Sequence, residues 1–345
     1  MRTVKAFIVA ALGVAVLGWS GTVTAQELVV SMWGGNWKAG AKKIIASEFT
    51  KRTGMSVRFI TGGTMDRLTK AKVNKGDPES DLTITTTHVA FLYISDGLFE
   101  KLDMSLIPNA KELFPAAIRS PYHIGLYSYV YTPVFRTDAM PAGFRIRSWN
   151  DLWGPAVKGK LALPDFDPSH IIVVAALLSG ADAAHWKAGI PKLKALKPSI
   201  KAFYQSDAVS QELMTSGEAP VQVMLSINGY HLIEQGMPVR IEIPKEGAVV
   251  GIDAIAINKG TKNLAAAHRF INVALDADVN RRLAEFYKAG PMNRNAKLDP
   301  ELAKLPGVFT TPEQWKTQAI LIPDEVRAKL LPEWKAWFTE NMAGQ

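Results

Sequence analysis

The first part of the chain alternates short apolar runs with amphipathic segments of helical spacing. Residues 27–33 form an apolar run rich in β-forming residues, and residues 56–60 and 81–84 have the same character. Between these runs, residues 39–53 and 65–73 place apolar side chains three or four positions apart, which indicates helices. Strands separated by helices of this length predict a mostly parallel sheet with right-handed crossovers.

A second α/β unit is predicted to begin near Phe135. Residues 160–164 and 221–224 have the composition of strands, and helical segments follow them at 171–179 and 229–235. The fold class is therefore α/β, with two units that each contain a sheet flanked by helices.

The last part of the chain returns to the same alternation. Residues 248–258 form an apolar, strand-like run, and residues 263–275 follow with the apolar face of a helix. The stretch from Pro312 to Met342 is helical in composition and carries several tryptophan and aliphatic anchors. We expect this stretch to pack as an amphipathic helix against one of the two units.

Residues 1–25 predict a signal peptide. Arg2 and Lys5 precede an apolar run of roughly a dozen residues, which is shorter than the ~20 needed to cross a bilayer. Small residues end the segment at Ala25, where we expect cleavage. The chain has no cysteine, which excludes a lipid anchor on an N-terminal cysteine and a disulfide framework. The expected location is the bacterial periplasm.

Composition narrows the class of partner. A chain of 345 residues with 48% hydrophobic residues is long enough for two domains with real cores. The formal net charge of +8 is spread along the chain, which is typical of a solvated surface and not of a nucleic-acid footprint. We expect a monomer that binds no nucleic acid.

Three loops follow the strands of the first unit, at the edge where open α/β sheets bind ligands. Each combines glycine or hydroxyl residues with an aromatic or polar side chain, which suits a pocket for a small molecule. Turn formation or core packing is the alternative role for single residues. The loops are Trp33-Gly34-Gly35-Asn36-Trp37, Thr61-Gly62-Gly63-Thr64 and Thr85-Thr86-Thr87-His88.

Acidic residues of the second unit extend this candidate site. Asp165 and Asp167 follow a predicted strand, and they either face a ligand amine or cap the next helix. Asp253 lies within an apolar run, so it must pair internally or face a polar ligand, and we favour a ligand or hinge role. Asn228 completes the set of candidate ligand-binding residues.

Several segments together resemble one protein family. Besides the signal peptide and the first loop, they are Ser148-Trp149-Asn150-Asp151-Leu152-Trp153 with Lys158-Gly159-Lys160-Leu161, the turn Ile243-Pro244-Lys245-Glu246-Gly247, and the helical region 266–289 that ends at Gly290-Pro291-Met292-Asn293. The chain resembles periplasmic substrate-binding proteins of ABC importers, in their spermidine/putrescine-binding branch.

The resemblance implies a type II periplasmic-binding-protein fold, in which two lobes close over a ligand and a membrane permease recognises the closed form. It implies no cofactor and no catalysis. The expected parts are lobe 1 at 26–132 plus 250–303, lobe 2 at 135–247 plus 304–345, and a two-strand hinge near 131–136 and 245–251.

The match to polyamine-binding relatives is incomplete. The positions that correspond to their aromatic, hydroxyl and acidic pocket residues are Trp33, Thr86, His88, Asp165 and Asp253. Gly35 replaces an acidic residue and Gly251 an aromatic one, which weakens the case for a cationic amine. The two glycines are expected either to enlarge the cleft or to admit backbone contacts. A polyamine or other organic cation therefore stands beside amino-acid-like, phosphonate-like and aromatic solutes.

The sequence gives weaker support to other functions. Ferric-ion or anionic-solute binding within the same fold is an alternative, because tyrosines are available, although no two are adjacent. An exported enzyme is the alternative from another class, but the six histidines have no metal-ligand spacing, and no nucleophile elbow or phosphate loop is present. A sensor subunit would use the same fold as a transport protein.

Overall fold

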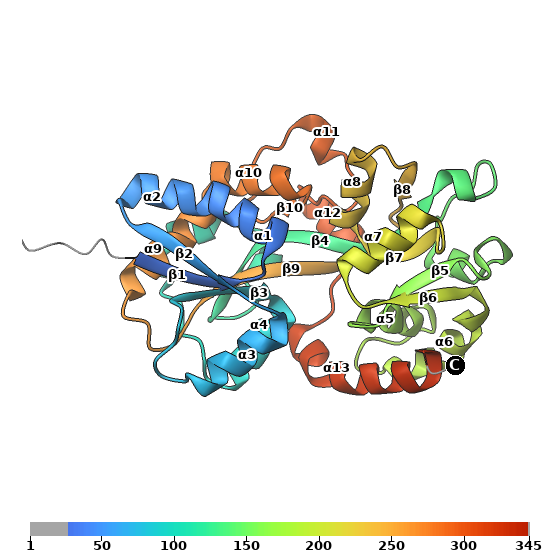
Figure 1. The fold of residues 1–345 in the computed structure, drawn as a ribbon, viewed down its shortest axis with the longest axis horizontal. Helices are drawn as coiled ribbons and strands as arrows, with labels where there is room; N and C mark the ends of the chain where they lie inside the picture. Colours follow the sequence, from blue (N-terminus) through green and yellow to red (C-terminus); the bar gives the residue numbers. More distant parts are fainter. Residues whose placement is uncertain (1–26, 344–345) are drawn as a thin grey trace, which may run out of the picture.

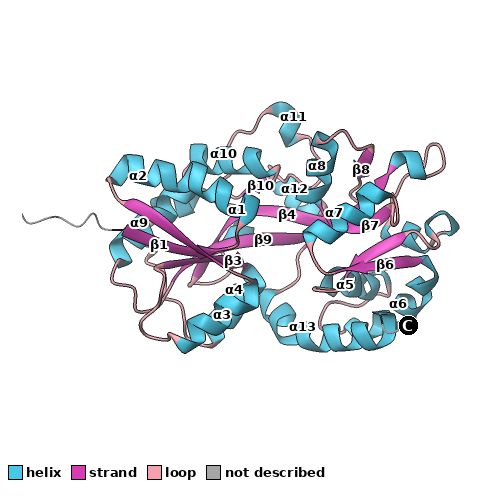
Figure 2. Ribbon diagram, viewed as in Figure 1, coloured by secondary structure: helices cyan, strands magenta, loops and turns pink. Residues whose placement is uncertain are grey.

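The computed structural model describes residues 27–343, in which two α/β lobes lie side by side (Figure 1). The predicted signal peptide lies outside the described residues. Figure 2 shows helices on both faces of the strands in each lobe. One continuous sheet runs through the molecule in the strand order β2-β1-β3-β9-β4-β7-β5-β6. No helix within residues 27–343 combines the length and the apolar character that a membrane span requires.

The first lobe follows the predicted alternation of strands and helices. Its three N-terminal strands are parallel, in the order β2-β1-β3, and each leads into a helix at the same edge of the sheet. The elements are β1 (Glu27–Met32), α1 (Gly35–Gly40), the π-helix η1 (Ala41–Ala46), α2 (Ser47–Thr53), β2 (Ser56–Thr61), α3 (Thr64–Val73), β3 (Leu82–Thr86) and α4 (Thr87–Ser95).

The lobes are connected by two long strands, β4 (His123–Arg136) and β9 (Ala248–Ile257). The first part of β4 pairs antiparallel with β9 in the first lobe, and its last part pairs with β7 in the second. Tyr131 lies at the change, because it pairs with both Val249 and Leu225. The resemblance implied a hinge strand near 131–136, which is the last part of β4. The hydrophobic pattern did not predict the rest of this strand, since Gly125 and Pro133 interrupt it.

The second lobe repeats the architecture. Strands β6, β5 and β7 are parallel, and β7 pairs antiparallel with β4. Its elements are β5 (Leu161–Pro164), α5 (Ser169–Leu178), α6 (Ile190–Leu196), β6 (Ile200–Tyr204), α7 (Asp207–Ser216), β7 (Val221–Leu225), α8 (Ser226–Glu234) and β8 (Val239–Ile241). The analysis of hydrophobic spacing had not identified β6 and α7, which lie between two predicted elements.

The C-terminal part of the chain serves both lobes. In the first lobe it forms α9 (Leu264–Ala274), α10 (Ala277–Tyr287) and β10 (Gly290–Pro291), and α11 (Pro300–Ala303) follows. The stretch predicted to be helical from 312 to 342 is divided into α12 (Pro312–Thr317), β11 (Ala319–Ile320), α13 (Asp324–Phe338) and the π-helix η10 (Thr339–Ala343). The prediction of one helical stretch was wrong for two reasons. Strand β11 pairs with β9, and Pro323 precedes the first residue of a separate helix, α13.

Two of the segments that carry the family resemblance pack against each other. Trp149 is fully buried in the 3₁₀-helix η6 (Trp149–Trp153), and its indole N–H donates to the carbonyl of Gly247 at 2.7 Å. Ser148 caps this helix, and its hydroxyl donates to Glu246 at 2.5 Å. The tryptophan segment therefore fixes the turn that leads into β9.

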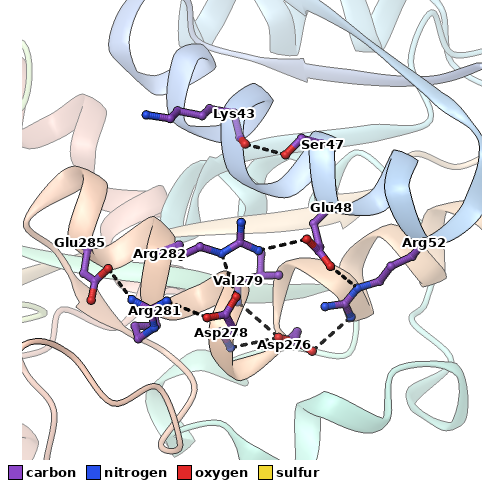
Figure 3. Close-up of polar contacts among 10 residues, drawn as sticks. All are labelled: Lys43, Ser47, Glu48, Arg52, Asp276, Asp278, Val279, Arg281, Arg282 and Glu285. Carbon is purple, nitrogen blue, oxygen red and sulfur yellow. Dashed lines mark hydrogen bonds and ion pairs between the residues drawn. The ribbon is translucent and has the colours of Figure 1, made fainter.

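A charged network ties α2 to the start of α10 (Figure 3). Glu48 accepts from Arg52 at 2.8 Å and from Arg282 at 3.3 Å, while Arg52 also reaches Asp276 at 3.2 Å. Asp276 in turn caps α10 by accepting from two backbone N–H groups. These side chains are partly exposed, so each pair contributes at most about 1 kcal/mol. The network fixes α2 relative to α10.

Candidate functional site

A cavity of about 440 Å³ lies where the two lobes face each other, a size that suits a small organic solute. Its wall is formed by the start of α3, the start of α4, the connecting strands, the loop after β5 and one face of α13. The lining residues are Thr64, Met65, Thr86, Thr87, His88, Val89, Leu92, Tyr129, Tyr131, Phe166, Asp167, Gly251, Ile252, Arg327, Ala328, Leu331, Pro332 and Lys335.

The structure brings five of the sequence-predicted residues to this wall: Thr64, Thr86, Thr87, His88 and Asp167. Thr86 ends β3 in an extended conformation, and Thr87 begins α4, so the strand-to-helix turn presents both to the cavity. The Thr86 hydroxyl is buried and has no hydrogen-bond partner among the described residues. The hydroxyl of Thr87 instead donates to Asp324 at 2.7 Å, which ties α4 to α13.

The predicted loop at residues 33–37 lies behind the wall. The indole N–H of Trp33 donates to the Thr64 hydroxyl at 2.8 Å, so Trp33 positions a lining residue. Trp37 stacks on Tyr127, with ring centroids 6.1 Å apart and planes inclined by 6°. Gly34 and Gly35 form the turn, in which Gly35 has a φ of +58° that favours glycine. A direct ligand contact from these four residues stays a prediction.

Asp253 is held by two tyrosines. The hydroxyls of Tyr127 and Tyr129 donate to its two carboxylate oxygens at 2.7 and 2.9 Å. The residue is 2% exposed and does not line the cavity. Burial raises the pKa of the Asp253 carboxyl to about 6, although the two tyrosine hydroxyls act in the opposite direction. The internal pairing that the sequence left open is therefore present.

The ring of Tyr129 occupies the space beside Gly251. A Cβ atom at this glycine would lie 2.1 Å from Cε2 of the Tyr129 ring. Gly251 therefore does not enlarge the cleft, because the tyrosine ring fills the volume that a side chain at this position would occupy. A backbone contact between this glycine and a ligand stays a prediction. Both residues line the cavity, so the contact forms part of its wall.

Two further predicted residues lie outside the lining. Asp165 is half-buried and accepts from Gln205 at 3.3 Å. Asn228 is buried on α8, beside Asp207 of the neighbouring helix α7. Burial raises the pKa of the Asp207 carboxyl, and the Asn228 amide partly offsets this effect. Their part in binding stays a prediction.

The sequence analysis missed Arg327, the central charged residue of the wall. It is 6% exposed on α13, and its Nη2 donates to Asp167 at 2.5 Å and to His170 Nε2 at 3.1 Å. His170 has its proton on Nδ1, since this nitrogen lies 2.9 Å from the carbonyl of Asp167. The Arg327 Nε has no partner among the described residues.

A helical spacing within α13 marks the face that reaches the cavity. Arg327, Leu331 and Lys335 are four residues apart, so they lie along one side of the helix. This spacing was visible in the sequence. Only the fold reveals that this side of α13 faces α4 and the loop after β5, because both contacts are distant along the chain.

The similarity of the chain to known proteins agrees with a binding cavity between two lobes. Residues 45–310 match the sequence profile of the bacterial extracellular solute-binding proteins. The chain belongs to this family. It is therefore a substrate-binding protein of an ABC importer and not an enzyme, and the resemblance noted in the sequence is confirmed.

Individual relatives of this solute-binding protein differ in their ligands. The spermidine/putrescine-binding periplasmic protein of Escherichia coli is 28% identical over 281 residues, covering 78% of this chain and 80% of the relative. A gamma-aminobutyric acid-binding protein of Pseudomonas aeruginosa is 25% identical over 283 residues, covering 78% of each chain. A solved ABC transporter structure from Clostridium perfringens has a TM-score of 0.79 at 28% identity, covering 91% of this chain and 99% of the other.

The charge of this solute-binding protein's cavity depends on how its titratable side chains are buried and paired. Burial raises the pKa of Asp167, but Arg327 above all lowers it, and His170, His88 and the Ser169 side chain act in the same direction, so the pKa lies well below the usual range. Burial lowers the pKa of His170 to about 3 and that of His88 well below its usual value, so both are neutral at pH 7. Among the described lining residues, two cations face one carboxylate.

Apolar side chains complete the wall of the binding site. Met65, Val89 and Leu92 come from the first lobe, Phe166 from the second and Leu331 from α13. An apolar surrounding strengthens a charge contact made within it. The site therefore combines apolar walls with a net positive charge.

Proposed function

We propose that this solute-binding protein takes up a small solute that carries a carboxylate, as amino-acid-like compounds do. The observation that supports this proposal is the charge of the cavity wall. Arg327 and Lys335 face the cavity, and Asp167, the one carboxylate among the described lining residues, is already bound to Arg327. A carboxylate is recognised by an arginine or lysine through charge-assisted hydrogen bonds.

A free polyamine fits this wall less well. Two or more ammonium groups need carboxylates or aromatic faces to replace their water. Asp167 is engaged by Arg327, and Asp253 is engaged by two tyrosines behind the wall. The ring faces of Tyr129 and Tyr131 are suited to one ammonium group, which an amino acid also carries.

The setting of this function follows from the family and the sequence. We infer that a cleaved signal peptide over residues 1–25 delivers the protein to the periplasm, where it acts as a monomer with no nucleic-acid partner. The lobes and the hinge near 131–136 and 245–251 close over the solute. The change of pairing partners at Tyr131 supports this hinge.

Calorimetric titration of the protein tests the ligand class. We expect γ-aminobutyrate and other small amino acids to bind more tightly than putrescine and spermidine. Lys335→Gln removes an exposed lining cation and is expected to weaken amino-acid binding roughly tenfold, since a charge-assisted hydrogen bond contributes about 1.5–3 kcal/mol.

Lys329→Gln is the matched control, because Lys329 is also exposed on α13 but does not line the cavity. It is expected to leave the affinity unchanged. Tighter binding of putrescine than of every carboxylate tested would overturn the proposal, and so would equal affinities in the Lys335→Gln and Lys329→Gln variants.

A further inference from the structure

Lysines gather at the outer end of the second lobe. Two segments of the chain, 152–164 and 183–206, contain seven lysines and no acidic residue. Figure 1 shows α6 and β6, which belong to the second of these segments, at the end of the lobe that lies away from the first lobe. The fold therefore concentrates at one place a part of the positive charge of the chain.

Contacts between the two segments hold them together. The N–H of Gly159 donates to the carbonyl of Pro198 at 3.0 Å, and the indole N–H of Trp153 donates to the carbonyl of Lys192 at 2.9 Å. Beyond these contacts, β5 and β6 pair in parallel. Because the loop after β5 lines the cavity between the lobes, the starts of these strands lie at the opposite end of the lobe. The lysines of both segments therefore share this outer end.

Most of these lysines have no partner for their charge. Lys187 pairs with Glu333 at 2.9 Å, and Nζ of Lys160 lies 3.8 Å from the sulfur of Met140. The remaining five form no ion pair and no side-chain hydrogen bond within residues 27–343, and we call them the outer lysine cluster. They are the exposed Lys158, Lys194 and Lys201 and the half-buried Lys192 and Lys197.

The outer helices of the first lobe differ, because their arginines are paired with carboxylates (Figure 3). Arg52 contacts Glu48 and Asp276. Arg282 contacts Glu48 and Asp278. An ion pair adds little to the electric field outside the protein, whereas an unpaired cation adds its full charge. The outer lysine cluster therefore creates a local positive field that the paired arginines do not.

An extended anionic surface fits this cluster better than a single small anion. The five lysines come from a turn, from α6, from the 3₁₀-helix η9 (Lys197–Ser199) and from β6, and none lines the cavity between the lobes. Recognition of one anion typically uses the rigid fork of an arginine, whereas a lysine presents a point charge on a flexible stem. Flexible point charges suit a surface whose negative groups are many and mobile, such as a layer of phospholipid headgroups.

We propose that the outer lysine cluster binds the anionic phospholipid headgroups of the membrane that holds the permease. The inference rests on membership of the importer family, since a binding protein of an ABC importer must meet a permease in a membrane, and it does not depend on which solute is carried. Weak, reversible adsorption would keep the protein near the membrane surface and raise its concentration beside the permease.

Co-sedimentation with lipid vesicles in about 0.15 M salt tests the proposal. The processed protein, which lacks residues 1–25, is mixed with vesicles of phosphatidylcholine alone, or of phosphatidylcholine and phosphatidylglycerol in equal parts. We expect binding to the anionic vesicles only, and release in about 1 M sodium chloride, where the Debye length falls to about 3 Å. Lys194→Gln with Lys201→Gln should weaken the binding roughly thirtyfold, which corresponds to about 2 kcal/mol for two lysines near an anionic surface.

Lys42→Gln with Lys51→Gln is the matched control. Both lysines are exposed on the first lobe and form no ion pair among the described residues, so this variant removes the same charge and should bind the vesicles nearly as well as the unchanged protein. The proposal is overturned if anionic vesicles bind no more protein than neutral ones, if binding persists in about 1 M salt, or if the two double variants lose binding alike. Neither pair of lysines lines the cavity, so calorimetry should give an unchanged solute affinity in both variants, and the two proposals are tested separately.

Discussion

The ion pair between Arg327 and Asp167 gives the sharpest test of the site's electrostatics. Both residues are nearly fully buried, at 6% and 7% exposure, and their contact is 2.5 Å. Replacing one partner of such a pair leaves the other charge buried and uncompensated, which typically costs about 3–5 kcal/mol. We therefore expect Arg327→Met to lower the free energy of unfolding by about 3–5 kcal/mol at pH 7.

The pH dependence of this loss distinguishes electrostatics from packing. In the native protein the pKa of Asp167 lies below its unfolded value, so its contribution is present at pH 7 and is lost only in strong acid. Without Arg327, burial raises that pKa above the unfolded value, and stability from this group is lost as the pH rises. The loss in free energy of unfolding that Arg327→Met causes should therefore be smaller at pH 4.5 than at pH 7, by about 1 kcal/mol or more.

Urea denaturation at the two pH values measures both quantities. The double variant Arg327→Met with Asp167→Asn should be more stable than Arg327→Met alone, because it removes the stranded charge. Arg58→Met is the control, since the Arg58–Glu27 pair is half-exposed and its loss should cost at most about 1 kcal/mol. A loss below 1 kcal/mol for Arg327→Met, or a loss that does not change with pH, would refute this account of the pair.

Two other predictions concern the connecting strands. Gly251→Ala should lower the free energy of unfolding by about 1–3 kcal/mol in urea, since its Cβ collides with Tyr129; no loss would mean that the ring moves freely. The Asp253 carboxyl has a pKa of about 6, which is above its unfolded value. Its contribution to the free energy of unfolding is therefore complete below about pH 4, and about 3 kcal/mol of it is lost as the pH rises through 6. Asp253→Asn should remove that slope in thermal unfolding between pH 4 and 7, and an unchanged slope would contradict it.

Local patterns predicted most of the elements because each places its apolar residues at a regular spacing. The parallel strands β1, β2 and β3 and the helices between them have this regularity. The long strand β4 does not, because it is buried almost throughout and contains Gly125 and Pro133. Its extended form is imposed by pairing with β9 and β7, which are more than eighty residues away along the chain.

The site was harder to predict than the fold because pairing decides what each polar residue does. Thr86, His88 and Asp167 line the cavity because each lies at or just after the end of a strand, at the edge where open α/β sheets bind ligands. Their contact with a ligand stays a prediction. Asp253 is unusual in the sequence because it lies within an apolar run, but the sequence does not reveal that Tyr127 and Tyr129 bind it from β4. Arg327 was missed because a single arginine in an amphipathic helix is ordinarily exposed.

The position of α13 would link the charge of the site to the lobe closure proposed above. Asp324, at the start of α13, binds two residues of the first lobe. Its carboxylate accepts from the Thr87 hydroxyl at 2.7 Å and from Nε of Arg119 at 2.7 Å. One turn later, Arg327 binds Asp167 of the second lobe. A rotation between the lobes must therefore break one of these contacts or bend the helix. If the solute carboxylate binds at Arg327, as proposed, it competes with Asp167 for the same guanidinium. Binding would then weaken the second contact and shift the balance between lobe arrangements.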